Sequence, residues 1–170
     1  IPSRSEQLIE HAPSSITVIT QQEIEATGLT SLEELLNYVS GVQYHRDGYY
    51  SQVTFRGRWS DGNDILVLLD GIRLNNPVSA TAFVSFQNIS LSAIEKVEII
   101  KGPGSALYGS NAYNGVISLT SKQQGNQLSV GYGSFDYKKA SASLHFANDD
   151  GRISINAEAY ADKGEDYAPF

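Results

Sequence analysis

The residues with the most obvious chemical potential form a glycine-rich segment, residues 101–110, with the sequence KGPGSALYGS. A dinucleotide-binding fingerprint would need glycine where Leu107 stands, and a P-loop beginning at Gly104 would need lysine in place of Ser110. Pro103 also removes a backbone amide that a phosphate-binding loop would use. The spacing therefore favours a tight backbone turn over a nucleotide site.

The other candidates for catalysis or metal binding are scattered. His11, His45 and His145 lie far apart in the sequence and have no carboxylates at ligand spacing. The acidic segment 61–64 lacks the alternating ligands and the distal glutamate of a calcium loop. No serine occupies a nucleophile elbow, and the chain contains no cysteine. We therefore expect no catalytic residue, no metal site and no cofactor, and hence no enzyme.

Large aromatic side chains and arginine are concentrated in segments with strong turn content. Such side chains on loops are typical of recognition surfaces, although they can equally cap the edge of a core. They are Tyr49, Tyr50, Arg58, Trp59, Phe83 and Phe86.

The composition narrows the class of protein. The chain has 170 residues, with 12 basic and 19 acidic side chains and a net charge of −7, which argues against a nucleic-acid partner. The longest aliphatic run, Ile65–Leu69, is too short for a membrane-spanning helix, but β-barrel strands need no such run. The chain has no methionine and no leader-like start, so we expect a processed chain or a fragment.

Two short helices near the start would position these loops. The first is predicted to begin at a capping box, residues 20–23, and to end at Gly28. The second is predicted to begin at a capping box over residues 31–34 and to end at Gly41. Its apolar positions fall on one side of the helix. They are Leu32, Leu35, Leu36 and Val39.

Short strands and glycine-containing loops follow, up to about residue 122. Asp70-Gly71 is typical of a hairpin turn. The expected strands are 16–19, 42–44, 53–55, 65–69, 72–74, 97–100 and 116–119, with single helical turns at 92–95 and 105–108. Two helices with short mixed strands predict a small α+β domain.

From residue 126 to residue 161 apolar and polar residues alternate without any helical period. This alternation is typical of transmembrane β-barrel strands. It is also typical of a soluble antiparallel meander with one dry face. Taken alone, the pattern favours the soluble meander.

A succession of motifs adds a family resemblance over residues 13–122. The motifs are PSSITVI (13–19), SLEELL (31–36), SGV (40–42), FRG (55–57), LVLLDGI (66–72) and IEKVEIIKGPGSALYGSNA (94–112). In this order they resemble the plug domain of TonB-dependent outer-membrane receptors. The departures from the family pattern are local. NGVISL at 114–119 stands where the family usually has a strand with two glycines and an asparagine, and VSG at 39–41 stands where a proline commonly precedes the glycine. Lys96 replaces a usual arginine.

The resemblance implies two parts. Residues 1–122 would form an α+β plug domain, a small mixed sheet with short helices, and residues 123–170 would be antiparallel β-strands that begin a transmembrane β-barrel. The plug in this family fills a barrel of about 22 strands. About three strands cannot close, so the chain should be a fragment with open edges that favour strand swapping or aggregation. Leu128, Ala142, Leu144, Phe146, Ile153 and Ile155 would face lipid, and Ser143, His145, Asn156 and Glu158 would face the plug.

The resemblance also implies a function. It indicates active uptake of a scarce nutrient across the bacterial outer membrane, most often a ferric siderophore and sometimes haem or cobalamin, with energy supplied through TonB. The plug would act as a gate in the barrel lumen, facing the periplasm. No convincing TonB-contacting segment is apparent in residues 1–12. The alternative is a secreted or periplasmic soluble binding module without a transport role.

Residue roles follow from the resemblance. The loops at about 45–51, 58–63 and 75–86 would point outward, and their ligand-contact candidates are Tyr49, Tyr50, Arg58, Trp59, Asn76, Phe83 and Phe86. Arg56 and Lys96 match basic positions that pair with barrel-wall carboxylates and lock the plug in place, and Glu98 is a third lock candidate. Ordinary surface charges are the alternative for these three.

Overall fold

The structure, a computed structural model, describes residues 15–29, 31–47, 50–57, 62–82, 89–104, 108–148, 151–161 and 163. Its internal contacts divide the chain into two units, Ile1–Ser121 and Lys122–Phe170. Each unit is described by itself below.

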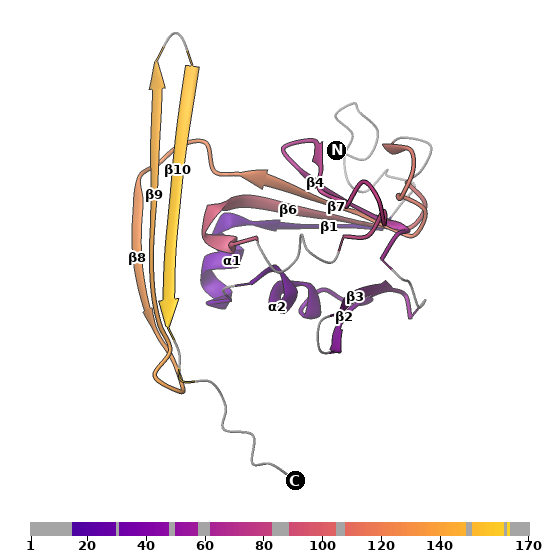
Figure 1. Cartoon of the computed structure of the whole chain (residues 1–170), viewed down its shortest axis with the longest axis horizontal. Coiled ribbons are helices and arrows are strands. Elements are labelled where there is room, and N and C mark those ends of the chain that lie inside the picture. The colour runs from indigo at the N-terminus through magenta and orange to yellow at the C-terminus, as the bar shows by residue number, and fades with distance from the viewer. Residues whose placement is uncertain are drawn as a thin grey trace. The chain divides into compact units, whose positions relative to one another are not determined.

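A five-stranded mixed sheet forms the centre of the first unit, with the strand order β1-β6-β7-β4-β5 (Figure 1). Its strands are β1 (Ser15–Thr20), β4 (Ile65–Leu69), β5 (Ile72–Arg73), β6 (Ile94–Lys101) and β7 (Gly115–Ser121). β4 and β7 run parallel, and the other neighbouring strands run antiparallel. The continuous aliphatic sequence of β4 suits a strand that is covered on both faces.

Both predicted capping boxes are confirmed. α1 (Gln21–Thr27) begins at Thr20, whose hydroxyl accepts from Glu23 N, and it ends at Gly28 in the left-handed conformation. α2 (Leu32–Asn37) begins in the same way at Ser31. It ends earlier than the predicted stop at Gly41, because the amides of the next residues bond three residues back and tighten the last turn. Among the described residues, no helix is both long enough and apolar enough to cross a membrane.

Apolar side chains cover the two faces of the sheet in separate clusters. The helices lie on one face (Figure 1), and the predicted stripe of α2 is buried there with alternate residues of β4, β6 and β7. The stripe consists of Leu32, Leu35, Leu36 and Val39. On the other face Leu66, Leu68, Ile100 and Val116 pack with Ala112. The sheet is therefore a rigid platform for the loops at its edges.

Several predicted elements differ in extent. β2 (Val42–Asp47) and β3 (Tyr50–Phe55) are longer than expected and form a separate antiparallel pair. The helical turn predicted at 92–95 is a 3₁₀ helix, η2 (Leu91–Ala93), because Ile94 already belongs to β6. Most of the turn predicted at 105–108 lies outside the described residues.

The second unit is a three-stranded antiparallel sheet of β8 (Gln127–Tyr132), β9 (Lys138–Asn148) and β10 (Gly151–Ala161), in the order β8-β9-β10. The register pairs Leu128 with Ala142 and Leu144 with Ile155, so the residues predicted to face lipid share one face. The opposite face is polar. It carries an ion pair between Lys139 and Glu158 at 3.0 Å, a hydrogen bond between the hydroxyls of Ser129 and Ser141 (2.6 Å) and another between His145 and Ser154 (3.0 Å).

Candidate functional site

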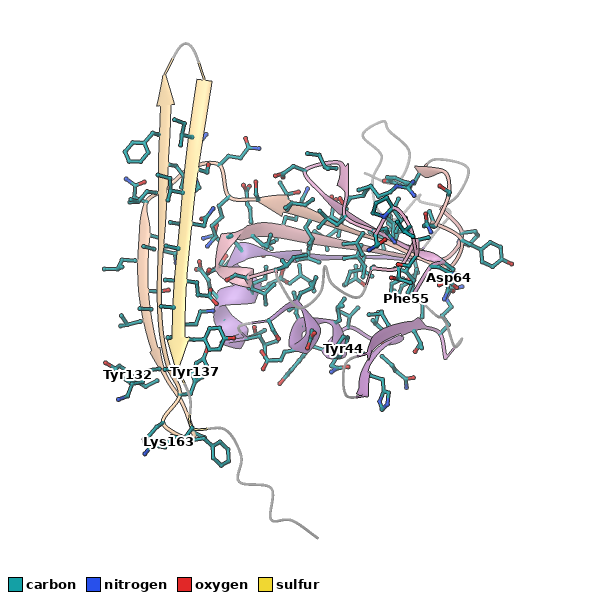
Figure 2. The ribbon with its side chains drawn as sticks, viewed as in Figure 1. Tyr44, Phe55, Asp64, Tyr132, Tyr137 and Lys163 are labelled. Carbon is teal, nitrogen blue, oxygen red and sulfur yellow. The ribbon has the colours of Figure 1, made fainter. Side chains whose placement is uncertain are left out.

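Four segments meet at the edge of the five-stranded sheet where β4 and β7 begin. Because β4 and β7 are parallel, the segments that enter them lie together, and the segments that leave β5 and β6 return to the same edge. These segments, which we call the loop edge, are 62–64, 74–82, 102–104 and 108–114. Figure 2 labels Asp64, whose carbonyl accepts from Asn114 N at 2.9 Å.

Residues 76–81 form a compact turn within the loop edge. The side-chain oxygen of Asn76 accepts from the backbone amides of Val78 (2.8 Å) and Ser79 (3.0 Å), which makes an Asx turn. The amide of Asn76 donates to the carbonyl of Thr81 at 2.8 Å and closes the turn. The Val78 side chain is left 93% exposed at the tip. Asn76, a predicted ligand contact, therefore uses its amide oxygen to shape the turn.

Asn75 attaches this turn to the sheet. Its side chain is 6% exposed and accepts from Val67 N at 2.9 Å. It donates to the carbonyls of Ile65 (2.9 Å) and Ala80 (3.0 Å). These three hydrogen bonds offset the cost of burying the amide group. The sequence gives no signal for this role beyond an asparagine that follows a short strand.

The predicted ligand contacts are only partly within the described residues. Asn76 is described in full. Tyr50 is the first residue of β3 and pairs with Asp47, rather than lying in a loop, because the antiparallel pairing extends almost to the turn. Its side chain is not described. Tyr49, Arg58, Trp59, Phe83 and Phe86 lie outside the described residues. Their assembly into one site stays a prediction.

Arg56, a predicted lock residue, lies at a joint between three elements of the first unit. Its backbone is left-handed (φ 55°), and its amide donates to the carbonyl of Gly41 at 2.9 Å. The exposed guanidinium donates to the carbonyl of Lys101 at 3.1 Å. The Lys101 ammonium in turn donates to the carbonyl of Ser40 at 2.9 Å. Arg56 thus connects the end of β3 with the end of β6.

Lys96 and Glu98, the other lock candidates, lie away from Arg56. They form an ion pair at 3.4 Å on one face of β6. Lys96 is five residues from Lys101, which corresponds to about 16 Å along a strand. The structure therefore brings Lys96 and Glu98 together but places Arg56 at the opposite end of the strand. The lock role of all three stays a prediction.

The titratable groups give no indication of a metal site. In the part of the chain that the structure describes, no three histidine, aspartate or glutamate side chains lie close enough together to hold a metal ion. The pKa of Glu23 is lowered, first because the backbone amide of Thr20 donates to its carboxylate and second because the Thr20 hydroxyl does. That carboxylate belongs to the start of α1 and not to the loop edge.

Comparison with known proteins places this geometry in context. Residues 9–116 match the family described as TonB-dependent Receptor Plug Domain. The vitamin B12 transporter BtuB of Vibrio vulnificus is 40% identical over 155 residues, which cover 86% of this chain and 25% of the transporter. The chain spans about a quarter of the length of the curated relatives it matches.

Solved structures agree in fold. The alcaligin outer membrane receptor FauA of Bordetella pertussis superposes with a TM-score of 0.72 at 20% identity, over 94% of this chain and 28% of FauA. The ferric-catecholate import receptor Fiu of E. coli K12 has a TM-score of 0.59 at 27% identity, over 85% of this chain and 21% of Fiu. The relatives named here are transporters and receptors rather than enzymes.

Proposed function

Because the chain belongs to the TonB-dependent receptor plug domain family, we propose that it is the gate of a receptor that takes up a corrinoid nutrient of the vitamin B12 class. Receptors of this family lie in the bacterial outer membrane with the plug inside the barrel, and the chain is an outer-membrane plug domain with the mixed sheet and short helices expected from its sequence.

The observation that carries the choice of ligand is the identity to vitamin B12 transporters. Relatives with that name are 34–40% identical to the chain, whereas the alcaligin receptor FauA is 20% identical. The sequence resemblance alone made a ferric siderophore the first expectation. The similarity to vitamin B12 transporters, which covers up to 98% of the chain, supports cobalamin instead.

The chemistry of the segment 74–88 supports the same choice. The sequence from Leu74 to Asn88 contains no charged side chain. Its described part offers the exposed Val78 together with the neutral polar side chains of Asn76 and Ser79. A corrinoid presents methyl groups and neutral side-chain amides, which match apolar and hydrogen-bonding contacts. An anionic iron chelate would be matched better by arginine and lysine.

The proposed mechanism is a gate that responds to its ligand. Corrinoid bound at the outer loops would favour one of two arrangements of the plug, and a ligand can shift such an equilibrium only by its differential affinity for the two. TonB would supply the energy from the periplasmic side, and the second unit would supply the first strands of the surrounding barrel. The proposed ligand contacts are Tyr49, Tyr50, Arg58, Trp59, Asn76, Phe83 and Phe86.

Equilibrium titration of the full-length receptor in detergent tests the ligand. Cyanocobalamin is expected to bind at least 100-fold more tightly than a ferric hydroxamate or a ferric catecholate. Tighter binding of either iron chelate would overturn the corrinoid proposal. It would support the second candidate, a ferric siderophore receptor, which the 27% identity to Fiu favours.

Trp59 gives a residue-level test of the same proposal. Aromatic side chains in loops contribute strongly to binding when a ligand buries them. We expect Trp59→Ala in the full-length receptor to weaken cyanocobalamin binding about tenfold, or about 1.4 kcal/mol. Normal binding with a lower stability to denaturant would instead identify Trp59 as a core residue.

A further inference from the structure

Asn111 connects three segments of the loop edge through its side chain. Its amide nitrogen donates to the carbonyl of Asn63 at 2.5 Å and to that of Ala80 at 3.2 Å. Its amide oxygen accepts from the guanidinium of Arg73 at 2.6 Å. Arg73 also donates to the hydroxyl of Ser110 at 3.1 Å. One side chain thus joins the segment before β4, the turn after β5 and the segment before β7.

The side chains of Asn111 and Asn75 hold the exposed turn 76–81 at Ala80. Its backbone is left-handed (φ 61°), a conformation that residues with a Cβ disfavour. Its carbonyl accepts from both Asn111 and Asn75, while its amide donates to the carbonyl of Asn76 at 2.8 Å. Strained backbone of this kind persists where the surrounding contacts determine it, and it is common at ligand-binding sites.

We infer that Asn111 is a positioning residue for ligand binding: it holds the turn 76–81 in a preset shape that presents Val78 and Ser79 to the ligand. The inference rests on the proposed function, because it takes a corrinoid as the ligand of the turn. A turn that is ordered before binding loses less conformational entropy on binding, so the affinity is higher.

The chemistry of the position requires asparagine. Asn111 must donate to two carbonyls, accept from a guanidinium and adopt a left-handed backbone (φ 69°), which asparagine tolerates better than most residues. Aspartate has nearly the same shape and would keep the contact with Arg73. It would lose both donated hydrogen bonds and would place a negative charge against the carbonyls of Asn63 and Ala80. Asn111→Asp is therefore a nearly isosteric test.

The first measurement is hydrogen exchange in the ligand-free, full-length receptor. In Asn111→Asp the amides of Ala80 and of the rest of the turn 76–81 are expected to exchange at least tenfold faster, while those of β6 keep their protection. The matched control is Asn37→Asp, because the side-chain oxygen of Asn37 accepts from Tyr44 N at 2.9 Å and aspartate retains that acceptor. Unchanged exchange of the turn in Asn111→Asp would overturn the inference.

The second measurement is cyanocobalamin titration of the same proteins. Asn111→Asp is expected to bind at least fivefold more weakly, and Asn37→Asp to bind within twofold of wild type. Because glycine adopts a left-handed backbone without penalty, Ala80→Gly should restore part of the affinity in the Asn111→Asp background. Loss of thermal stability with unchanged affinity would show a purely structural role and overturn the inference. If wild type itself fails to bind cyanocobalamin, the proposed function fails, and the exchange result alone decides whether Asn111 positions the turn.

Discussion

The carboxylate of Asp70 accepts two hydrogen bonds from Ser121, one from the backbone amide at 2.9 Å and one from the hydroxyl at 2.6 Å. Asp70 opens the tight turn after β4, and Ser121 is the last residue of both β7 and the first unit. The amide of Asp70 also donates to the carbonyl of Leu119 at 2.9 Å. The side chain therefore extends the parallel pairing of β4 with β7 to the last residue before the second unit.

The first prediction concerns the two hydrogen bonds between Asp70 and Ser121. Asp70→Ala removes both acceptors and also places alanine in a left-handed conformation (φ 50°), so we expect a local destabilisation of about 2 kcal/mol. The Ser121 amide should exchange about thirtyfold faster in the full-length receptor. Ser121→Ala, which keeps the amide and loses one hydrogen bond, should show a smaller effect. Equal exchange of the Ser121 amide in Asp70→Ala and wild type would show that these hydrogen bonds contribute nothing to local stability.

The second prediction concerns Gly115, the first residue of β7. A Cβ at this position would overlap the ring of Phe55 and lie 2.6 Å from the carbonyl oxygen of Ile100. We expect Gly115→Ala to destabilise the first unit by about 3 kcal/mol or more, measured by urea unfolding. Phe55→Leu in the same chain should recover part of this loss. Gly151→Ala is the control, since a Cβ there meets nothing within 4 Å.

The sequence predicted the elements that depend on neighbours within one or two helical turns. The capping boxes at Thr20 and Ser31 and the buried stripe of α2 all rest on contacts three to seven residues apart. Membership of the plug domain family was also predicted correctly, because the resemblance depended on the order of several motifs rather than on any one of them.

The contacts that the sequence does not predict join residues that are distant along the chain. Asn111 and Ala80 are 31 residues apart, and Asp70 and Ser121 are 51 residues apart. No local pattern distinguishes such asparagine and aspartate residues from ordinary turn formers. Strand ends were also misjudged, because pairing with a neighbouring strand lengthened β2 and β3 beyond their β-branched residues.

The third prediction concerns the capping box of α1 and its dependence on pH. The pKa of Glu23 is lowered by the Thr20 backbone amide and, to a smaller extent, by the Thr20 hydroxyl. A carboxyl group with a lowered pKa in the folded state stabilises the fold above the ordinary pKa of glutamate, and this contribution is lost as the pH falls through the lowered value. In an NMR titration of the chain we expect Thr20→Ala to raise the pKa of Glu23 only part of the way to its ordinary value, since the backbone amide remains. Thr27→Ala is the control and should leave it unchanged. A Glu23 pKa at or above the ordinary value in wild type would contradict the assignment.

The last prediction separates two roles of Arg56, the proposed lock between plug and barrel. If its guanidinium pairs with a carboxylate of the barrel wall, Arg56→Ala in the full-length receptor should loosen the plug and raise the leak of small solutes in a liposome-swelling assay. Arg56→Lys should give an intermediate leak, because lysine keeps the charge but lacks the two-pronged donor geometry. The alternative is that Arg56 acts only within the plug, where Arg56 and Lys101 together hold the ends of β3 and β6 to the segment before β2. Lys101→Ala tests this alternative, because it removes the hydrogen bond to Ser40 but leaves Arg56 and the backbone carbonyl that accepts from it. A leak in Arg56→Ala without a leak in Lys101→Ala would support the lock, whereas equal leaks in the two variants would assign Arg56 to the joint alone.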